Sequence, residues 1–157
     1  MEFLKTDIDG VFVIKPKVIE DERGYFFESF SEREFNENVD KIDFVQDNQS
    51  KSCYGVVRGL HFQKGEYAQS KLVRCVKGEI LDVAVDLRKD SPTYGKYVSV
   101  VLSEEAIVQY KCDYFYNKES EGGINPFDEN LNIEWGIPKD KVILSEKDLK
   151  WQKLTMI

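Results

Sequence analysis

The 157-residue chain is poor in the residues that build metal centres and disulfides. It has a single histidine, His61, so it cannot supply the histidine cluster that many metal sites require. Its cysteines are odd in number and form no Cys-x-x-Cys or Cys/His ligand spacing; they are Cys53, Cys75 and Cys112. Glycine-rich phosphate loops are also absent. We therefore expect reduced cysteines, no metal and no cofactor.

Long apolar segments are missing as well. No run of residues approaches the length of a membrane span, and residues 1–5 lack the apolar core of a signal peptide, so we expect a cytoplasmic protein without membrane contact. The net charge of −7 argues against nonspecific nucleic-acid binding. A local basic group at Arg58, Lys71 and Arg74 can still receive phosphates. The hydrophobic content of 41% is ordinary for a globular protein, and we expect one domain over residues 1–157.

What the chain does contain is a hydrophobic pattern of period two, which is typical of β-strands. This pattern predicts strands at residues 11–14, 25–30, 44–46, 55–62, 71–76, 79–87 and 97–102. A turn at residues 21–24 predicts a hairpin between the first two of these strands, and Lys77 with Gly78 predicts a tight turn between residues 71–76 and 79–87. Residues 31–39 begin with a serine followed three residues later by Glu34, which predicts a short helix. Many short strands with few helices indicate a sandwich or jelly-roll barrel.

His61 is the residue best suited to acid–base chemistry near neutral pH. Arg58 and Lys71 place two permanent positive charges near it in the sequence. This combination suits removal of a proton next to a carbonyl group on an anionic substrate. The alternative is that His61 is a satisfied, partly buried group without a catalytic role.

Several motifs, in order along the chain, resemble one family. They are DERGYFFESF (residues 21–30), VRGLHFQ (57–63), the segment 71–88, DSPTYG (90–95) and ILSEKD (143–148). Together they resemble the dTDP-4-dehydrorhamnose 3,5-epimerases, enzymes of the dTDP-L-rhamnose pathway. The resemblance implies an all-β, cupin-like antiparallel jelly roll with a few short helices.

The chain departs from the family pattern at one place. Between Glu105 and Ala106 the family carries a further strand pair of roughly two dozen residues, with an Ile-Pro turn and an Ala-His-Gly-Phe motif. The segment Leu-Ser-Glu-Glu could occur on both sides of the missing piece, so that a deletion between repeats would leave this junction. The second active-site histidine of the family therefore has no counterpart here.

The resemblance assigns four catalytic residues. His61 matches the base, Asp148 the carboxylate that holds its imidazole, and Lys71 the cation that stabilises the enolate at O4. Tyr110 matches the acid that returns a proton from the opposite face. Structural alternatives are a solvated cation for Lys71, a core or edge aromatic for Tyr110, and a helix N-terminal acid for Asp148.

The resemblance also implies substrate-binding residues and a partner subunit. Those matching positions that reach into a neighbouring subunit's nucleotide site are Arg23, Phe26 and Glu28, and those matching contacts to the base and pyrophosphate are Gln46, Asn48 and Arg58. Arginine suits bidentate phosphate recognition, although Arg23 can instead be a simple turn charge. A site completed by a partner requires a homodimer.

Two functions remain open on this reading. The first is epimerisation of C3 and C5 of a dTDP-linked 4-keto-6-deoxyhexose. The second is a catalytically impaired homologue that binds nucleotide-sugar, because loss of two strands leaves unpaired edges and an opened core. Epimerisation at one centre, or of a sugar on another nucleotide, is a further alternative.

Overall fold

The computed structural model describes residues 1–154, and the side chains of all of these except residues 103–106. The strands are β1 (Glu2–Lys5), β2 (Phe12–Lys15), β3 (Ile19–Asp21), β4 (Gly24–Phe26), β5 (Gln46–Lys51), β6 (His61–Gln63), β7 (Lys71–Val85), β8 (Tyr97–Cys112) and β9 (Glu121–Gly123). Within this part of the chain there is one α-helix, α1 (Glu32–Asn38), and the 3-10 turns are Gly65–Tyr67, Lys118–Ser120, Lys139–Lys141 and Asp148–Lys150. No helix in it is long and apolar enough to cross a membrane.

The largest sheet has the order β5-β8-β7, and both of its pairings are antiparallel. Asn48 lies opposite Tyr110, and Tyr110 lies opposite Val73, so these side chains share one face of the sheet. The other face carries an ion pair between Lys111 and Asp47, whose Nζ and Oδ2 are 2.7 Å apart. We call the face that carries Asn48, Tyr110 and Val73 the inner face of the sheet, and the face with the ion pair the outer face.

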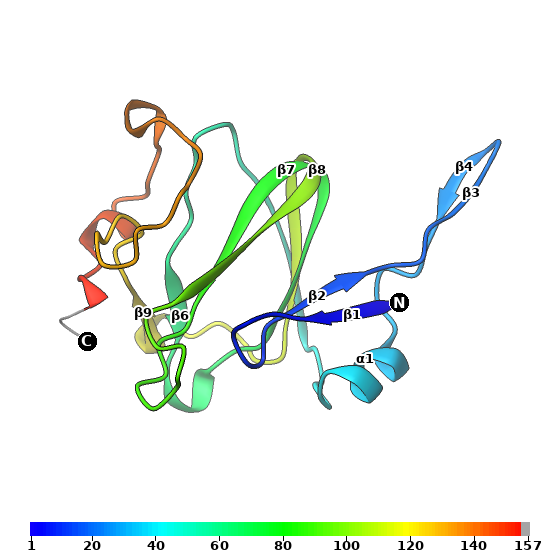
Figure 1. Ribbon diagram of the computed structural model, residues 1–157, viewed down its shortest axis with the longest axis horizontal. Coiled ribbons are helices and arrows are strands. Elements are labelled where there is room, and N and C mark those ends of the chain that lie inside the picture. The colour runs from blue at the N-terminus through cyan, green and yellow to red at the C-terminus, as the bar shows by residue number, and fades with distance from the viewer. Residues whose placement is uncertain (155–157) are drawn as a thin grey trace.

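β7 is one continuous strand, so the turn predicted at Lys77 and Gly78 is wrong. The register of β7 against β8 shifts between Cys75 and Glu79, and Gly78 has a φ of 93°. A bulge inserts an extra residue into one strand and bends it, and glycine accepts the positive φ without steric strain. Figure 1 shows β7 and β8 curving together through the centre of the molecule.

The predicted turn at residues 21–24 is present, but it joins different strands from those expected. It connects β3 to β4, while β2 pairs with β1. Pro16 follows the last residue of β2 and has no N–H to donate to a ladder, so the strand ends there. Figure 1 shows the β3–β4 hairpin projecting from the end of the molecule opposite β6 and β9.

Smaller differences concern the ends of the elements. The strand expected at residues 44–46 begins at Gln46, and that expected at residues 55–62 is formed only from His61 onward. The predicted helix is present as α1, but the Ser31 hydroxyl makes no capping bond. The carboxylate of Glu34 instead binds the ammonium group of Met1 at 2.6 Å. The predicted junction at Glu105 and Ala106 falls within β8, on residues whose side chains lie outside the described part.

Two apolar clusters support the sheet. On its outer side, the rings of Phe30, Phe35 and Phe44 lie with centroids 5.5–5.8 Å apart. The second cluster is formed by Ile124, Leu131 and Leu154, against which Val85 and Leu87 pack. The second cluster holds the C-terminal third of the chain against the end of β7, and this contact sets the position of the loops that follow β9.

A buried carboxylate organises the connection between β7 and β8. Asp86 is 3% exposed, and its carboxylate accepts hydrogen bonds from Arg88 Nε at 2.8 Å, Ser91 Oγ at 2.6 Å and Thr93 Oγ1 at 2.6 Å. The Arg88 guanidinium, together with the two hydroxyl groups, holds the pKa of Asp86 well below its usual range. The loop from residue 86 to residue 96 is therefore tied to one charged group.

Asp86→Ala should lower the free energy of unfolding by about 2–3 kcal/mol, because three donors lose their acceptor. The pKa of Asp86 is depressed in the folded state, so its contribution is present above the pKa of an unfolded aspartate and is lost as the pH falls toward the folded value. Urea unfolding should show a difference in the free energy of unfolding between the wild type and Asp86→Ala, and this difference should become smaller as the pH is lowered. Exposed Asp90 in the same loop provides the control, and an equal loss in Asp90→Ala would contradict this assignment.

Candidate functional site

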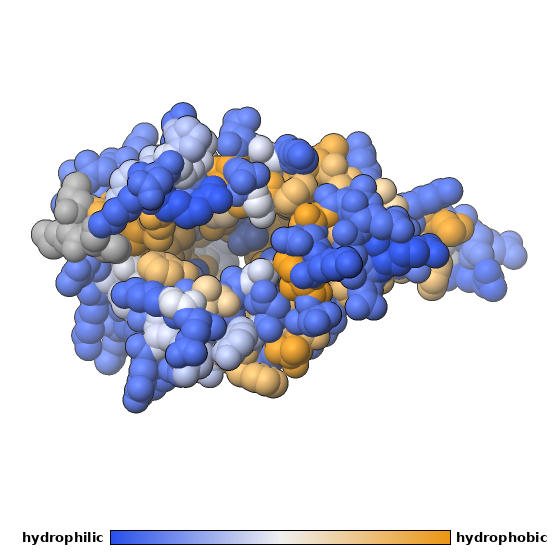
Figure 2. Space-filling model, turned by 90° about the horizontal axis from the view of Figure 1, so that it is seen from below, coloured by the Kyte–Doolittle hydropathy of each residue, from blue (hydrophilic) through white to orange (hydrophobic). Residues whose placement is uncertain are grey.

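A cavity of about 360 Å³ lies between the inner face of the β5-β8-β7 sheet and the β6–β9 pair. Figure 2, viewed from below, shows the molecule hollowed near the middle of its length. The cavity is lined by Gln46, Asn48, His61, Phe62, Gln63, Gln69, Lys71, Tyr110, Cys112, Tyr116, Glu121 and Lys147. It brings together three of the four predicted catalytic residues and two of the six predicted binding residues.

His61 begins β6, where it lies opposite Gly123 of β9. The His61 side chain is exposed to solvent, but the protein around it partly desolvates the imidazole. This desolvation lowers the pKa of His61, and the positive charges of Lys71 and Lys147 lower it further, while Asp148 and Glu121 act in the opposite direction. The imidazole is therefore neutral at neutral pH and able to accept a proton.

Asp148 is 5% exposed and is not among the residues that line the cavity. Its carboxylate accepts hydrogen bonds from Ser145 Oγ at 2.8 Å and from Trp151 Nε1 at 3.1 Å. Among the described residues, its hydrogen-bond donors are these two groups rather than His61. Its negative charge is nevertheless close enough to offset part of the lowering of the His61 pKa. Asp148 also begins a 3-10 turn, so the alternative of a helix-start acid describes its backbone position.

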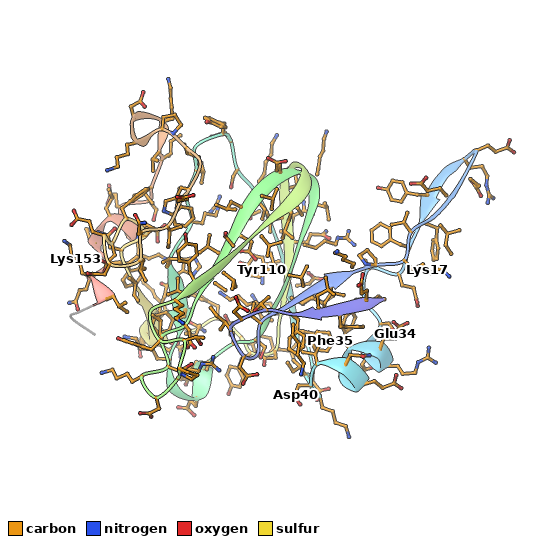
Figure 3. The ribbon with its side chains drawn as sticks, in the orientation of Figure 1. Lys17, Glu34, Phe35, Asp40, Tyr110 and Lys153 are labelled. Atoms are coloured by element: carbon orange, nitrogen blue, oxygen red, sulfur yellow. The ribbon has the colours of Figure 1, made fainter. Side chains whose placement is uncertain are left out.

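Lys71 and Tyr110 lie together on neighbouring strands. The Lys71 ammonium is 6.0 Å from the centroid of the Tyr110 ring. Tyr110 lies near the centre of the molecule in Figure 3. Burial raises the pKa of Tyr110, the neighbouring Cys112 raises it further, and Arg58 opposes the change. The phenol thus keeps its proton at neutral pH, which suits a proton donor.

The predicted binding residues divide into two groups. Gln46 and Asn48 line the cavity, where Gln46 Nε2 donates to Asn48 Oδ1 at 2.9 Å. Arg58 lies beside the cavity and donates to Ser52 Oγ at 3.0 Å. Its charge still reaches Tyr110.

The N-terminal binding residues lie apart from this cavity. Arg23 and Phe26 line a separate cavity of about 450 Å³ on the β3–β4 hairpin, and Arg23 pairs with Asp21 on the same turn. Glu28 follows the hairpin and is exposed. Within one chain, these residues do not contribute to the wall that carries His61.

Sequence reasoning missed five polar residues of the cavity, which are Gln63, Gln69, Tyr116, Glu121 and Lys147. Glu121 accepts from Lys147 Nζ at 2.6 Å and from the Tyr116 hydroxyl at 3.2 Å. The bond to Glu121 raises the pKa of Lys147, which therefore stays charged near His61. A signal for Lys147 exists, since it precedes Asp148 in the ILSEKD motif. Glu121 has no such signal beyond the glycine pair that follows it.

Metal ligation finds no support in this site. Among the described residues, no three histidine, cysteine, aspartate or glutamate side chains gather as ligands for an ion. The polar groups of the cavity are one imidazole, two ammonium groups, the Glu121 carboxylate, the Cys112 thiol, phenols and amides. Such a set can exchange protons with a bound molecule and stabilise negative charge on it.

Comparison with known proteins places the chain in a family. A sequence model described as dTDP-4-dehydrorhamnose 3,5-epimerase matches residues 5–106 and again 100–156. A dTDP-4-dehydrorhamnose 3,5-epimerase of Shigella flexneri is 49% identical over 175 positions, covering 98% of this chain and 96% of the relative. One of Methanothermobacter thermautotrophicus is 46% identical, covering 97% and 94%.

Solved structures give the same result. The epimerase of Elizabethkingia anophelis superposes with a TM-score of 0.93 at 45% identity, covering 99% of this chain and 97% of that one. The dTDP-6-deoxy-D-glucose-3,5-epimerase of Legionella pneumophila, solved in complex with dTDP-4-keto-L-rhamnose, gives a TM-score of 0.92 at 39% identity, covering 99% and 94%. The expected all-β, cupin-like jelly roll is thereby confirmed.

The comparisons also bear on the predicted gap. The Shigella flexneri alignment is 175 positions long, whereas this chain has 157 residues, so at least 18 positions have no residue here. The two family matches share residues 100–106, so the segment at the junction resembles the family on both sides of the missing piece. This overlap is what a loss between two similar flanking segments would leave.

Proposed function

Because the chain belongs to the dTDP-4-dehydrorhamnose 3,5-epimerase family, we propose that it inverts C3 and C5 of dTDP-4-keto-6-deoxyglucose through an enolate. The observation that carries this proposal is the gathering of His61, Lys71 and Tyr110 around one cavity. The relative from Legionella pneumophila, which was solved with dTDP-4-keto-L-rhamnose, supports the class of substrate.

Each of the three residues has a distinct proposed role. The ketone at C4 acidifies the neighbouring C–H bonds, and His61 takes one of these protons while the bond electrons move to form an enolate. Lys71 stabilises the negative charge that develops on O4. Tyr110 then donates its proton to the opposite face of the carbon, and the ketone forms again. Exchange with water restores the neutral imidazole and the phenol.

The nucleotide requires further groups. We assign Gln46, Asn48 and Arg58 to the base and pyrophosphate, because two of them line the cavity and Arg58 lies beside it with a guanidinium suited to phosphate. The remaining contacts come from a second subunit, which contributes Arg23 and Phe26 of its β3–β4 hairpin and Glu28 just after the hairpin. The hairpin exposes 62% of Tyr25 and 66% of Phe26, an apolar surface without cover in a single chain.

Sedimentation should therefore show a dimer, and Phe26→Asp should shift it toward monomer. A charge placed in an apolar interface is strongly unfavourable because it must be desolvated there. Val101, which is 57% exposed on β8, gives a matched control in Val101→Asp. A stable wild-type monomer that binds dTDP normally would contradict completion of the site by a partner.

A second candidate function is nucleotide-sugar binding without turnover. The observation that favours it is the gap of at least 18 positions relative to the Shigella flexneri epimerase, together with the solvent access to His61. Water in an active site weakens electrostatic stabilisation of the enolate. This candidate predicts binding of dTDP without chemistry.

Reaction of dTDP-4-keto-6-deoxyglucose in D2O separates the two functions. An active epimerase should place deuterium at C3 and C5 and form the inverted sugar, both of which NMR detects. We expect a lower rate than that of the Elizabethkingia anophelis relative, because the cavity is open. Binding of dTDP with no deuterium above the buffer rate would reject the epimerase and favour the second candidate.

A further inference from the structure

Trp151 lies between the β6–β9 strand pair, which carries His61, and the buried carboxylate of Asp148. No local sequence motif indicates this connection. The Trp151 indole lies against the backbone of Gly123, where an added Cβ would be 2.3 Å from Cδ2 and Cε2 of the ring. Gly123 is the residue that pairs with His61 in the β6–β9 ladder. Only glycine leaves room for the indole at this position, so the ring is fixed against the strand pair that carries His61.

The polar edge of the same ring contacts Asp148. Trp151 Nε1 donates to Asp148 Oδ1 at 3.1 Å, and Ser145 Oγ donates to Oδ2 at 2.8 Å. Backbone contacts fix the next residue as well, since Gln152 forms a parallel bridge with Ile124 and accepts from the Asn125 N–H at 2.9 Å. The indole is therefore held from both sides and joins the β6–β9 pair to the buried carboxylate.

We propose that Trp151 is a positioning residue that fixes Asp148 relative to His61. This inference rests on the proposed function, in which His61 is the base. The charged groups that act on His61 are Lys71 of β7, Glu121 of β9, Lys147 at the start of the last 3-10 turn, and Asp148, its first residue. Two acids oppose the lysines, and Asp148, which is the buried one, has the larger effect of the two, so its placement changes the basicity of the imidazole.

The test is Trp151→Phe, which keeps a ring against Gly123 but removes the N–H donor. The chain has one histidine, so the imidazole signal in an NMR titration reports His61 alone. We expect the pKa of His61 in Trp151→Phe to fall toward the pKa of His61 in Asp148→Asn. With substrate, kcat should fall by about ten- to a hundredfold while KM changes little.

The other tryptophan supplies a matched control. Trp135 Nε1 donates to the backbone oxygen of Pro126 at 2.8 Å, away from the cavity. Trp135→Phe therefore loses an equivalent N–H bond and should leave the His61 titration and kcat unchanged. An unaltered titration in Trp151→Phe, or one that moves to higher pH, would overturn the proposal.

Two measurements keep the inference independent of folding and of the proposed function. If Trp151→Phe does not fold, Asp148→Asn should shift the indole N–H signal of Trp151 and not that of Trp135, and no shift would reject the bond. The titration also needs no turnover. A wild-type protein without deuterium exchange, combined with the expected titration, would reject the epimerase while the positioning role stands.

Discussion

His61→Asn should lower the rate of epimerisation by about a hundred- to ten-thousandfold, the usual range for loss of a general base. The chain has no other histidine that could take over the proton. Binding of dTDP should stay close to normal, because the proposed nucleotide contacts come from other residues. Turnover is measured by NMR of the product, and binding by calorimetry.

Arg58→Ala provides the matched comparison for this prediction. It should weaken dTDP binding with a smaller effect on kcat, because the guanidinium is assigned to the phosphates.

The pH profile of the wild-type enzyme provides a second test of the role of His61. Since partial desolvation and two lysines lower the pKa of His61, the acid limb of kcat/KM should lie below the range of an ordinary histidine, and protonation at lower pH should inactivate the enzyme. Near-normal turnover in His61→Asn would remove His61 from the mechanism.

Local sequence singled out His61, with the charges of Arg58 and Lys71 near it, whereas Tyr110 and the binding residues of the cavity were found through the family resemblance. His61, Lys71 and Tyr110 all project from strands into the same space. The ion pair of Glu121 and Lys147 could not be found in this way, since it joins residues 26 positions apart and depends on how the loops after β9 fold back. Asp148 was found by its motif, but its bonds to Ser145 and Trp151 were not.

The errors in the fold have physical causes as well. A glycine with positive φ serves both a tight turn and a bulge, so Gly78 could not distinguish one bent strand from two strands. Only pairing with β8 along its whole length decides between them. The strand β3 was missed because all three of its residues are exposed, so they leave no alternating pattern. The correct turn was therefore assigned to the wrong partner strand.

Tyr110→Phe should separate proton removal from inversion. The phenylalanine fills the same space but has no hydroxyl to return a proton to the opposite face of the sugar, so formation of the inverted product should fall by about a hundredfold or more. His61 still removes and returns protons on its own face. In D2O the variant should therefore place deuterium into recovered substrate of unchanged configuration.

The control for this variant is Tyr97→Phe, on the same strand. The Tyr97 hydroxyl donates to the Asn132 carbonyl at 3.4 Å and does not line the cavity, so its loss should leave both exchange and inversion intact. NMR follows both quantities in one sample, since deuterium removes the C3 and C5 proton signals and inversion changes the ring couplings. If Tyr110→Phe inverts the sugar at the wild-type rate, the proton must come from another group, and Tyr116, whose hydroxyl bonds Glu121 in the same cavity, becomes the next residue to test.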